Sequence, residues 1–530
     1  MQSQSQPLLV SRRRFLQLTG GAVTLSLVSA CVPATPAAQA PAASAPSDSQ
    51  PQRGGVLRVA LIDDVTTLDP GTSIGMADVQ LAYLVYETLI RRAENEPDEP
   101  LYPALAEGWE TNEDATVHTF TLRQGITFHH GTAFTAKDVE YSINRLLDPA
   151  LAAGVAGSLG VIDKMEVVDD FTIKFHLKAA NVVLPYTLAG PGMQIVPHDR
   201  ATEQIIKEAS GTGPFVLAER VPGERTVCKR NETYWDKERP YLDEVQLLVL
   251  PEPATQIAAL TGGTLEMIHS IGLESVPMLE GTPEVSVLES SQGNYPVFAM
   301  RVDQKPFDDL RVRQAFKHAV DRAALNQALM SGRGTIGNDQ PIGPGTPFWA
   351  DVQPLAYDVA QAKALLAEAG YADGVEVALS TTEIGGPRVG DAAIAIQEMV
   401  KAAGFTITID KVPVGDFYAQ KYMQAPFFAS WWPVFSEPNA VLPLAFSSQG
   451  FYNESGWGDP DVDELIAAGR AELDVEKRKQ IYAEAQQIIS EEGGVLIPYF
   501  APFLQAIRTT VQGHIPSPRI VYQNLWLAQG

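Results

Sequence analysis

The chain has 530 residues, of which 45% are hydrophobic and 19% are charged, so it can bury sizeable hydrophobic cores without help from disulfides. Its 39 Lys and Arg residues and 64 Asp and Glu residues give a formal net charge of -25, which repels phosphate backbones and argues against a nucleic-acid partner. With 2 cysteines and 8 histidines, a disulfide scaffold and a cysteine-based zinc or iron–sulfur site are excluded.

The start of the chain has the composition of an export signal. The Arg12–Arg14 run precedes an acid-free, mildly apolar stretch, Leu18–Ala30, which is shorter than the roughly 20 residues of a membrane-spanning helix. The arginines beside Phe15-Leu16 resemble a twin-arginine signal, and Val28–Cys31 resembles a lipobox. A lipobox implies that Cys31 becomes the lipidated first residue of the mature chain. The alternative is an ordinary cleaved secretory signal that contains a cysteine.

Residues 31–53 predict a disordered tether. Pro, Ala, Ser and Gln dominate this stretch, so it has few large apolar side chains to bury. No later stretch has the roughly 18 consecutive apolar residues of a bilayer-spanning helix. We therefore expect a globular body in the periplasm or at the cell surface, attached to the membrane only through a lipid anchor.

The first half of the body predicts strands with few helices. Residues 56–62 are short, apolar and β-branched, which indicates a strand, and 79–90 has helical spacing. Residues 116–122 and 172–177 alternate as strands do. The largely apolar run at 245–250 predicts a central strand that is buried on both faces.

The second half of the body repeats a helix–glycine–strand plan. Asp358 begins a helix that ends at Gly370, and strand-like residues 375–379 follow. Residues 391–403, Gly404 and 406–409 repeat the plan, and 460–471 and 476–491 are further amphipathic helices. Such units build mixed or parallel sheets covered by helices, so the sequence predicts an α/β fold.

Two extended stretches, 293–302 and 495–508, bracket this second half of the body. Although they are far apart in the sequence, each has the pattern of a strand. We expect them to be paired strands that join two lobes.

The sequence offers little chemistry for catalysis. It contains no H-E-x-x-H and no G-x-x-x-x-G-K-[ST], and adjacent side chains such as His129 and His130 on a strand point to opposite faces, so they rarely share one ion. We expect neither an enzyme, nor a cofactor, nor a bound metal. An exported hydrolase is the alternative from another class.

Several motifs in a fixed order carry a resemblance to a known family. The chain resembles the peptide/nickel class, family 5, of extracellular solute-binding proteins, which serve ABC importers. His130 stands where that family usually has Asp. The segments that carry the resemblance are 109–110, 119–123, 128–131, 134–139, 211–215, 230–235, 306–315, 319–322, 459–463 and 497–499.

The resemblance implies a two-lobed fold like that of class II periplasmic binding proteins, with an extra domain in the first lobe and the ligand enclosed between the lobes. The expected division of the chain begins with an export signal at 1–30 and a tether at 31–53. In lobe 1, the base domain comprises 54–84, 196–294 and 499–530, and the extra domain comprises 85–195. Lobe 2 comprises 295–498.

The segment 430–439 is the most informative one for a binding site. Trp431 and Trp432 lie beside turn residues, and aromatic walls with a few polar groups suit a solute pocket, although the pair could equally pack in a core. The resemblance implies that this segment lines the cleft and that peptide-binding members have an Asp at the position of Val434. A buried ammonium group needs a carboxylate partner. Glu437 is the nearest candidate; otherwise the ligand is not an ordinary free peptide.

Further cleft residues follow from the resemblance or from the expected hinge. The resemblance implies that the cleft is lined by Ile74, Gly75 and Met76, which lie in one loop, and by Tyr499, which lies in the last motif. The expected hinge adds Asn294 and Tyr295.

The function expected from these features is capture of a short peptide or a solute of similar size. The closed, monomeric protein would deliver it to a permease and an ATPase. Alternative ligands in the same role are an opine, an oligosaccharide or chelated nickel. A receptor or chaperone without a transporter is a further alternative.

Overall fold

The computed structural model describes residues 50–73, 75–93, 99–383, 386 and 388–528. The export signal, Cys31, most of the expected tether and Ile74 therefore lie outside the described residues. The chain divides into two units, Met1–Gln50 and Pro51–Gly530. The fold described below is that of the second unit.

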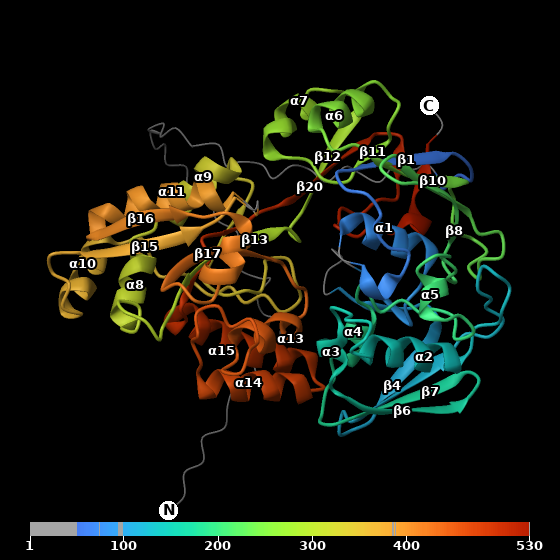
Figure 1. The fold of residues 1–530 in the computed structure, drawn as a ribbon, viewed down its shortest axis with the longest axis horizontal. Helices are drawn as coiled ribbons and strands as arrows, with labels where there is room; N and C mark the ends of the chain where they lie inside the picture. The colour runs from blue at the N-terminus through green and yellow to red at the C-terminus, as the bar shows by residue number, and fades with distance from the viewer. Residues whose placement is uncertain (1–49, 74, 94–98, 384–385, 387, 529–530) are drawn as a thin grey trace, which may run out of the picture. The chain divides into compact units, whose positions relative to one another are not determined.

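A mixed seven-stranded sheet has the order β12-β20-β11-β1-β10-β9-β8. The expected first strand is β1, which runs parallel to both of its neighbours, β10 and β11. Helix α1 (Met76–Val85) packs against this sheet through one shared core (Figure 1). The strands are β1 (Val56–Leu61), β8 (Phe215–Val221), β9 (Arg225–Arg230), β10 (Glu244–Val249), β11 (Met267–Ile268), β12 (Val285–Ser290) and β20 (Phe503–Arg508).

The prediction for 245–250 was only half right. Strand β10 lies inside the sheet, between β1 and β9. Val245 and Leu247 are buried, but Gln246 and Leu248 alternate with them and are intermediate or half-exposed. The strand has one buried face, because its other face lines an open surface concavity.

A four-stranded antiparallel sheet has the order β4-β5-β7-β6, and α2 (Ala136–Leu147) packs on it. Rings of Phe120 and Phe175 on neighbouring strands meet edge to face at 5.5 Å. The strands predicted at 116–122 and 172–177 are confirmed. The sheet consists of β4 (Ala106–Thr111), β5 (Val117–Leu122), β6 (Ile162–Asp169) and β7 (Thr172–Leu177).

A five-stranded sheet has the order β16-β15-β17-β13-β18, and β15 and β16 run parallel. The repeated helix–glycine–strand plan is confirmed: Asp358 accepts a hydrogen bond from Gln361 N at 2.9 Å, and Gly404 has a φ of 105°, which favours glycine. The strands are β13 (Asn294–Met300), β15 (Val375–Thr381), β16 (Phe405–Lys411), β17 (Phe427–Pro433) and β18 (Val495–Leu496).

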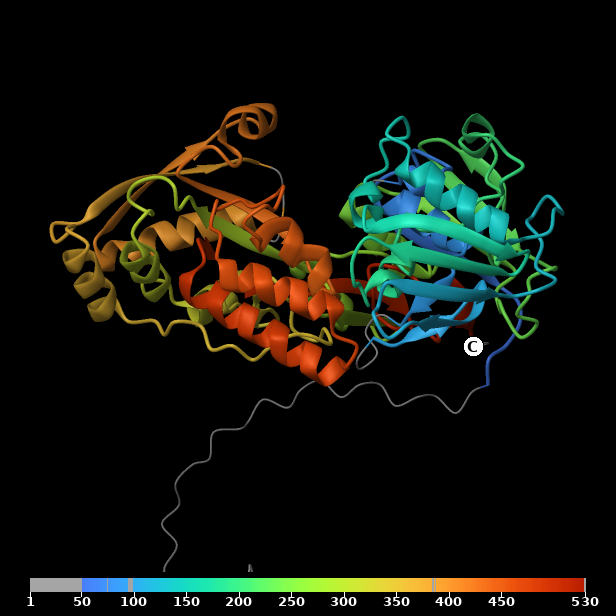
Figure 2. The same ribbon diagram turned by 90° about the horizontal axis from the view of Figure 1, so that it is seen from below.

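Helices cover both faces of this third sheet. On one face, buried side chains of α8 (Leu310–His318), α9 (Arg322–Met330), α10 (Val359–Glu368) and α11 (Val389–Val400) share a core with the strands. The other face is covered by α13 (Pro438–Val441), α14 (Pro460–Ala471) and α15 (Val475–Glu492). Figure 2 shows α14 and α15 side by side in orange-red. The sheet is therefore buried on both sides, as in other α/β layers.

The chain passes between the seven-stranded and five-stranded sheets twice, and the two passages are neighbours. Strand β12 pairs with β20, and β13 pairs with β18. Between these pairs, the amide of Ala501 donates to the carbonyl of Asn294 at 2.9 Å. The predicted pairing of 293–302 with 495–508 is confirmed for β13 and β18, whereas β20 pairs with β11 and β12. That these strands join two lobes with the expected bounds stays a prediction.

Among the described residues, no helix is both long enough and apolar enough to cross a bilayer.

Candidate solute-binding site

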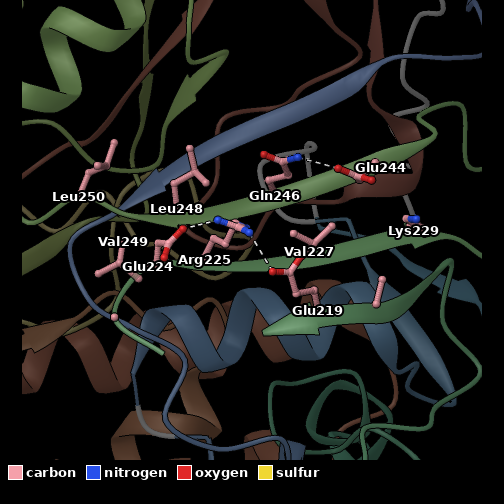
Figure 3. Close-up of a pocket in the computed structure, with 12 residues that line it drawn as sticks. Glu219, Glu224, Arg225, Val227, Lys229, Glu244, Gln246, Leu248, Val249 and Leu250 are labelled. Carbon is pink, nitrogen blue, oxygen red and sulfur yellow. Dashed lines mark hydrogen bonds and ion pairs between the residues drawn. The ribbon is translucent and has the colours of Figure 1, made fainter. Parts of the chain in front are cut away.

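One surface concavity is poorly suited to binding a solute. It has a volume of about 730 Å³ and lies on β8, β9 and β10, where Figure 3 shows its side chains. Arg225 contacts Glu219 at 2.8 Å, and Gln246 donates to Glu244 at 2.6 Å. These polar groups already bond one another, and none of the sequence-predicted site residues lies there.

A smaller concavity, of about 60 Å³, is lined by residues from α1, from β2 (Ile90–Arg92) and from the last segment of the chain. We call it the arginine cavity because Arg91, Arg92 and Arg519 line it together with Gln194. Its wall includes Glu87, which accepts hydrogen bonds from Tyr234 Oη at 2.7 Å and from Trp235 Nε1 at 2.9 Å. Burial raises the pKa of Glu87.

The tryptophan pair lies at the end of β17, and antiparallel pairing places Trp432 opposite Tyr295 on β13. Successive strand residues point to opposite faces, so Trp431 packs on the core beneath α8–α11 and Trp432 on the core beneath α13–α15. Both rings are intermediate in exposure. The sequence alone could not decide between core and pocket, and the structure shows that each ring has both a packed and an accessible part.

Aromatic and acidic groups surround Trp432. Its ring lies 6.2 Å from that of Phe435 and 6.0 Å from that of Tyr452, and Tyr452 in turn contacts Phe451, which is 76% exposed. Trp432 Nε1 donates to Glu454 Oε1 at 3.1 Å. This aromatic group combines apolar area with a polar anchor, as solute pockets do.

We expect the carboxyl group of Glu454 to make the stability of the protein depend on pH. The side chain accepts from Ser430 Oγ at 2.8 Å, and burial raises its pKa from 4.5 to about 7. A carboxyl group with a raised pKa binds its proton more tightly in the folded state. Its contribution to stability is complete below pH 4.5 and is lost as the pH rises through about 7.

We expect Glu454→Gln to remove this part of the pH dependence. Urea unfolding of the parent and the variant at several values between pH 4.5 and 8 measures it: the free energy of unfolding should fall more steeply with rising pH in the parent. Glu464→Gln, at an exposed position of α14, is the control and should follow the parent. Parallel pH profiles for the parent and Glu454→Gln would contradict the assignment.

Val434 and Glu437 follow the tryptophans in different environments. The amide of Val434 donates to Gly293 O at 2.9 Å, and its side chain faces Gly343, where an added Cβ would lie 2.5 Å from Val434 Cγ1. Glu437 is 5% exposed and caps α13, with Oε1 accepting from Asn439 Nδ2 at 3.0 Å. Burial raises the pKa of Glu437, while nearby Arg478 and Arg92 lower it. As an acid for a ligand ammonium group, Glu437 stays a prediction.

Gly75 and Met76 lie where α1 begins, with Gly75 as its N-cap. A Cβ on Gly75 would lie 2.9 Å from Asp63 Oδ2, so the backbone passes close to the loop after β1. Ligands of α/β sheets bind beyond the carboxyl ends of parallel strands, which is the position of this loop. Contact of Gly75 and Met76 with a solute stays a prediction, and Ile74 is not among the described residues.

The remaining predicted residues lie at the passage between the sheets. Asn294 begins β13. Tyr295 and Tyr499 are 1% and 0% exposed, and the Tyr295 ring packs 5.2 Å from Phe500. Both tyrosines are packed into the protein here, so direct contact with a solute would need a movement of their neighbours. Their role as ligand contacts also stays a prediction.

Sequence reasoning missed two groups, the Glu454–Tyr452–Phe451 group and the arginine cavity. The adjacent Phe451-Tyr452 pair was an available signal, similar to that of the tryptophan pair. No spacing could have joined Arg91 to Arg519, because more than 400 residues separate them.

The comparisons with known proteins bear on the whole arrangement. A family model described as "Bacterial extracellular solute-binding proteins, family 5 Middle" matches residues 100–453. The chain belongs to this family. The family resemblance stated from the motifs is thereby confirmed, and its members are named for binding solutes.

Individual relatives of this solute-binding protein agree with the family assignment. It is 27% identical over 484 residues to heme-binding protein A of Haemophilus influenzae, covering 84% of this chain and 86% of that one. It is 28% identical over 451 residues to di/tripeptide-binding protein 2 of Pseudomonas aeruginosa, covering 78% and 84%. The solved structure of the periplasmic binding protein DppA from Helicobacter pylori with the peptide STSA has a TM-score of 0.75 at 24% identity, covering 90% and 99%. The α/β, two-lobed fold class is confirmed.

Proposed function

We propose that this solute-binding protein captures a short peptide, or a solute of similar size, between two lobes and releases it unaltered to the permease and ATPase of an ABC importer. The observation that carries the proposal is the aromatic group at the end of β17, next to the strands that pass between the sheets. Peptide-binding relatives and a peptide-bound structural neighbour support the ligand class.

The proposed lobes follow the sheets. Lobe 1 comprises 54–84, 196–294 and 499–530 with the extra domain 85–195, and lobe 2 comprises 295–498. The three larger sheets support this division, because apart from Asn294 at the start of β13 each draws its strands from one proposed lobe. The two-stranded sheet of β14 (Thr335–Ile336) and β19 (Tyr499–Phe500) lies at the proposed boundary and joins both lobes. The protein acts as a monomer in this proposal.

Closure of the lobes is the proposed mechanism. The passages β12–β13 and β18–β20 supply the few residues that absorb a rotation. A solute shifts the protein toward the closed form only through contacts that both lobes make with it. No side chain needs to form or break a bond of the solute.

A thermal-shift screen tests the ligand class. Short peptides, opines, oligosaccharides and chelated nickel are the probes, and a solute that binds the folded state raises Tm with its concentration. A shift with peptides supports the proposal. A shift only with an opine, an oligosaccharide or chelated nickel would remove the peptide claim.

The hydrolase alternative gains no support at the one motif that suits it. Gly71–Gly75 reads G-T-S-I-G, the spacing around some catalytic serines. Ser73 Oγ, however, donates to the backbone carbonyl of Asp69 at 3.4 Å. The hydroxyl therefore has a structural partner in the described loop rather than a base.

Lipid anchoring at Cys31 is part of the proposal and gives a direct prediction. Cys31→Ser should abolish incorporation of labelled palmitate and release the protein from the membrane fraction, because the acyl chains are its proposed attachment. Cys228→Ser, at a buried thiol, is the matched control and should keep the label. Labelled Cys31→Ser protein would contradict lipidation at this residue.

A further inference from the structure

We propose that Glu437 and Asn439 are positioning residues that hold the two lobes closed around a solute without touching it. The inference rests on the two lobes of the proposed function and gives Glu437 a role other than pairing with an ammonium group. It concerns the contact between α14 in lobe 2 and the segment before α4 (Leu184–Leu188) in lobe 1. We call this the interlobe contact.

A backbone hydrogen bond joins the two lobes at this contact. The amide of Val182, in the extra domain, donates to the carbonyl of Arg470 at 2.9 Å. Arg470 lies in the last turn of α14, where helix carbonyls have no partner further along their own helix. Neither residue belongs to the passages β12–β13 and β18–β20. A rotation of the lobes about these passages therefore changes the distance between Val182 and Arg470.

The lobe 1 side of the contact is held in place by its own lobe. The amide of Asn181 donates to Ala115 O at 2.8 Å, and Asn181 Oδ1 accepts from the amide of Val183 at 2.8 Å. Val182 and Val183 are 8% and 3% exposed and pack in a small core with Ala115. The amide of Val182 is therefore oriented before lobe 2 approaches, so the contact costs little conformational entropy.

The lobe 2 side is held by the side chain of Asn439. Its Oδ1 accepts from Arg470 Nε at 3.4 Å, and its Nδ2 donates to Glu437 Oε1 at 3.0 Å and to Tyr482 Oη. Glu437 in turn caps the start of α13. The amide of Asn439 thereby ties the end of α14, which presents the Arg470 carbonyl to lobe 1, to the start of α13.

Glu437 also lies near lobe 1. Burial raises the pKa of Tyr186, in α4, and the charge of Glu437 raises it further, so the carboxylate is close to that helix. Glu437 Oε1 already bonds Asn439, whereas among the described residues its Oε2 has no hydrogen-bond partner. Oε2 is open to a donor of lobe 1 or of a solute, and the second experiment below separates the two.

Distances between two spin labels test the interlobe contact without any solute. Lys137→Cys on α2 and Lys363→Cys on α10 place one label on each lobe at an exposed position. The full chain with Cys31→Ser takes labels only there, because Cys228 is buried. Double electron–electron resonance then gives the populations of closed and open forms. We expect the labelled parent to populate the separation found in this structure.

Asn439→Ala should raise the ratio of open to closed forms about 10-fold, the scale of one or two hydrogen bonds. Gln397→Ala is the matched control. It removes a half-buried amide that donates to Ile407 O at 2.7 Å inside lobe 2, and it should keep the parent's distances. Equal distributions in Asn439→Ala and the parent would overturn the proposal. So would a parent with no population at the separation of this structure.

Two variants of Glu437 separate its proposed role from contact with a solute. Glu437→Gln keeps an oxygen that accepts from Asn439 and should keep the parent's label distances, whereas Glu437→Ala should open the lobes as Asn439→Ala does. The probes for binding are trialanine and N-acetyl-trialanine. We expect Glu437→Ala to weaken both equally, mainly through faster dissociation.

Weaker binding of trialanine alone to Glu437→Gln would overturn the proposal, because Glu437 would then pair with the ammonium group of the peptide. Binding of neither peptide to the parent would count against peptide capture only, because the label distances decide the interlobe contact without a solute.

Discussion

Asp339→Asn is expected to lower the free energy of unfolding by about 3–5 kcal/mol. Asp339 is fully buried in the proposed second lobe, where Oδ2 accepts from Arg322 Nη2 at 2.6 Å and Oδ1 accepts from the amide of Ile497 at 2.9 Å. Lys317 is buried nearby, and burial lowers its pKa to about 8 although Asp339 opposes that shift. Loss of the carboxylate charge leaves two cations in the core with less compensation.

Urea unfolding with matched variants measures this loss. Glu398→Gln breaks the pair with Lys401, whose atoms are 2.6 Å apart but whose side chains are 63% and 53% exposed. That control should change the free energy of unfolding by less than about 1 kcal/mol, because solvent screens exposed pairs. If Asp339→Asn lowers the free energy of unfolding no more than the control does, the pair of Asp339 and Arg322 does not stabilise the fold as a buried ion pair.

Trp432→Ala is expected to weaken solute binding by about 30-fold, or about 2 kcal/mol, the scale of an aromatic hot spot. The ring contributes apolar area beside Phe435 and Tyr452, and its Nε1 is fixed by Glu454. Truncation removes both the surface and the group that orders Glu454.

Titration calorimetry with a solute that raises Tm measures the Kd. Trp109→Ala, at a half-buried ring in the four-stranded sheet, is the control: it should lower stability without changing the Kd. Unchanged affinity in Trp432→Ala, with stability lowered as in the control, would mean that Trp432 belongs to the core alone.

Local pattern was enough to predict most elements. Helix α14 has the bounds that its amphipathic spacing predicted, and α10 begins after the capping Asp358. The alternating residues of β5 and β7 became a sheet with a shared core. These signals lie within a few residues of the elements that they specify.

Predictions that depended on distant neighbours were less complete. Strand β10 is rich in Val and Leu, but only tertiary packing determines which of its faces is covered. Glu437 carries a suitable charge, yet its burial and its role as a cap on α13 come from the fold around it. The same holds for Arg519, which meets Arg91 only after the last segment of the chain has packed against α1 and β2.

The aromatic group is the part of the site that carries the proposed function. The aromatic group around Trp432 suits apolar parts of a solute. The acid that a peptide ammonium group needs is still unassigned, since Val434 cannot supply it and Glu437 is buried.

Mass spectrometry of the solute that denatured protein releases, after incubation with an isotope-labelled mixture of candidate solutes, tests the central claim most directly. The account predicts about one solute molecule per chain, with every bond intact and a mass equal to that of the compound supplied. Recovery of cleaved or otherwise modified products, or of no compound from a folded chain, would contradict it.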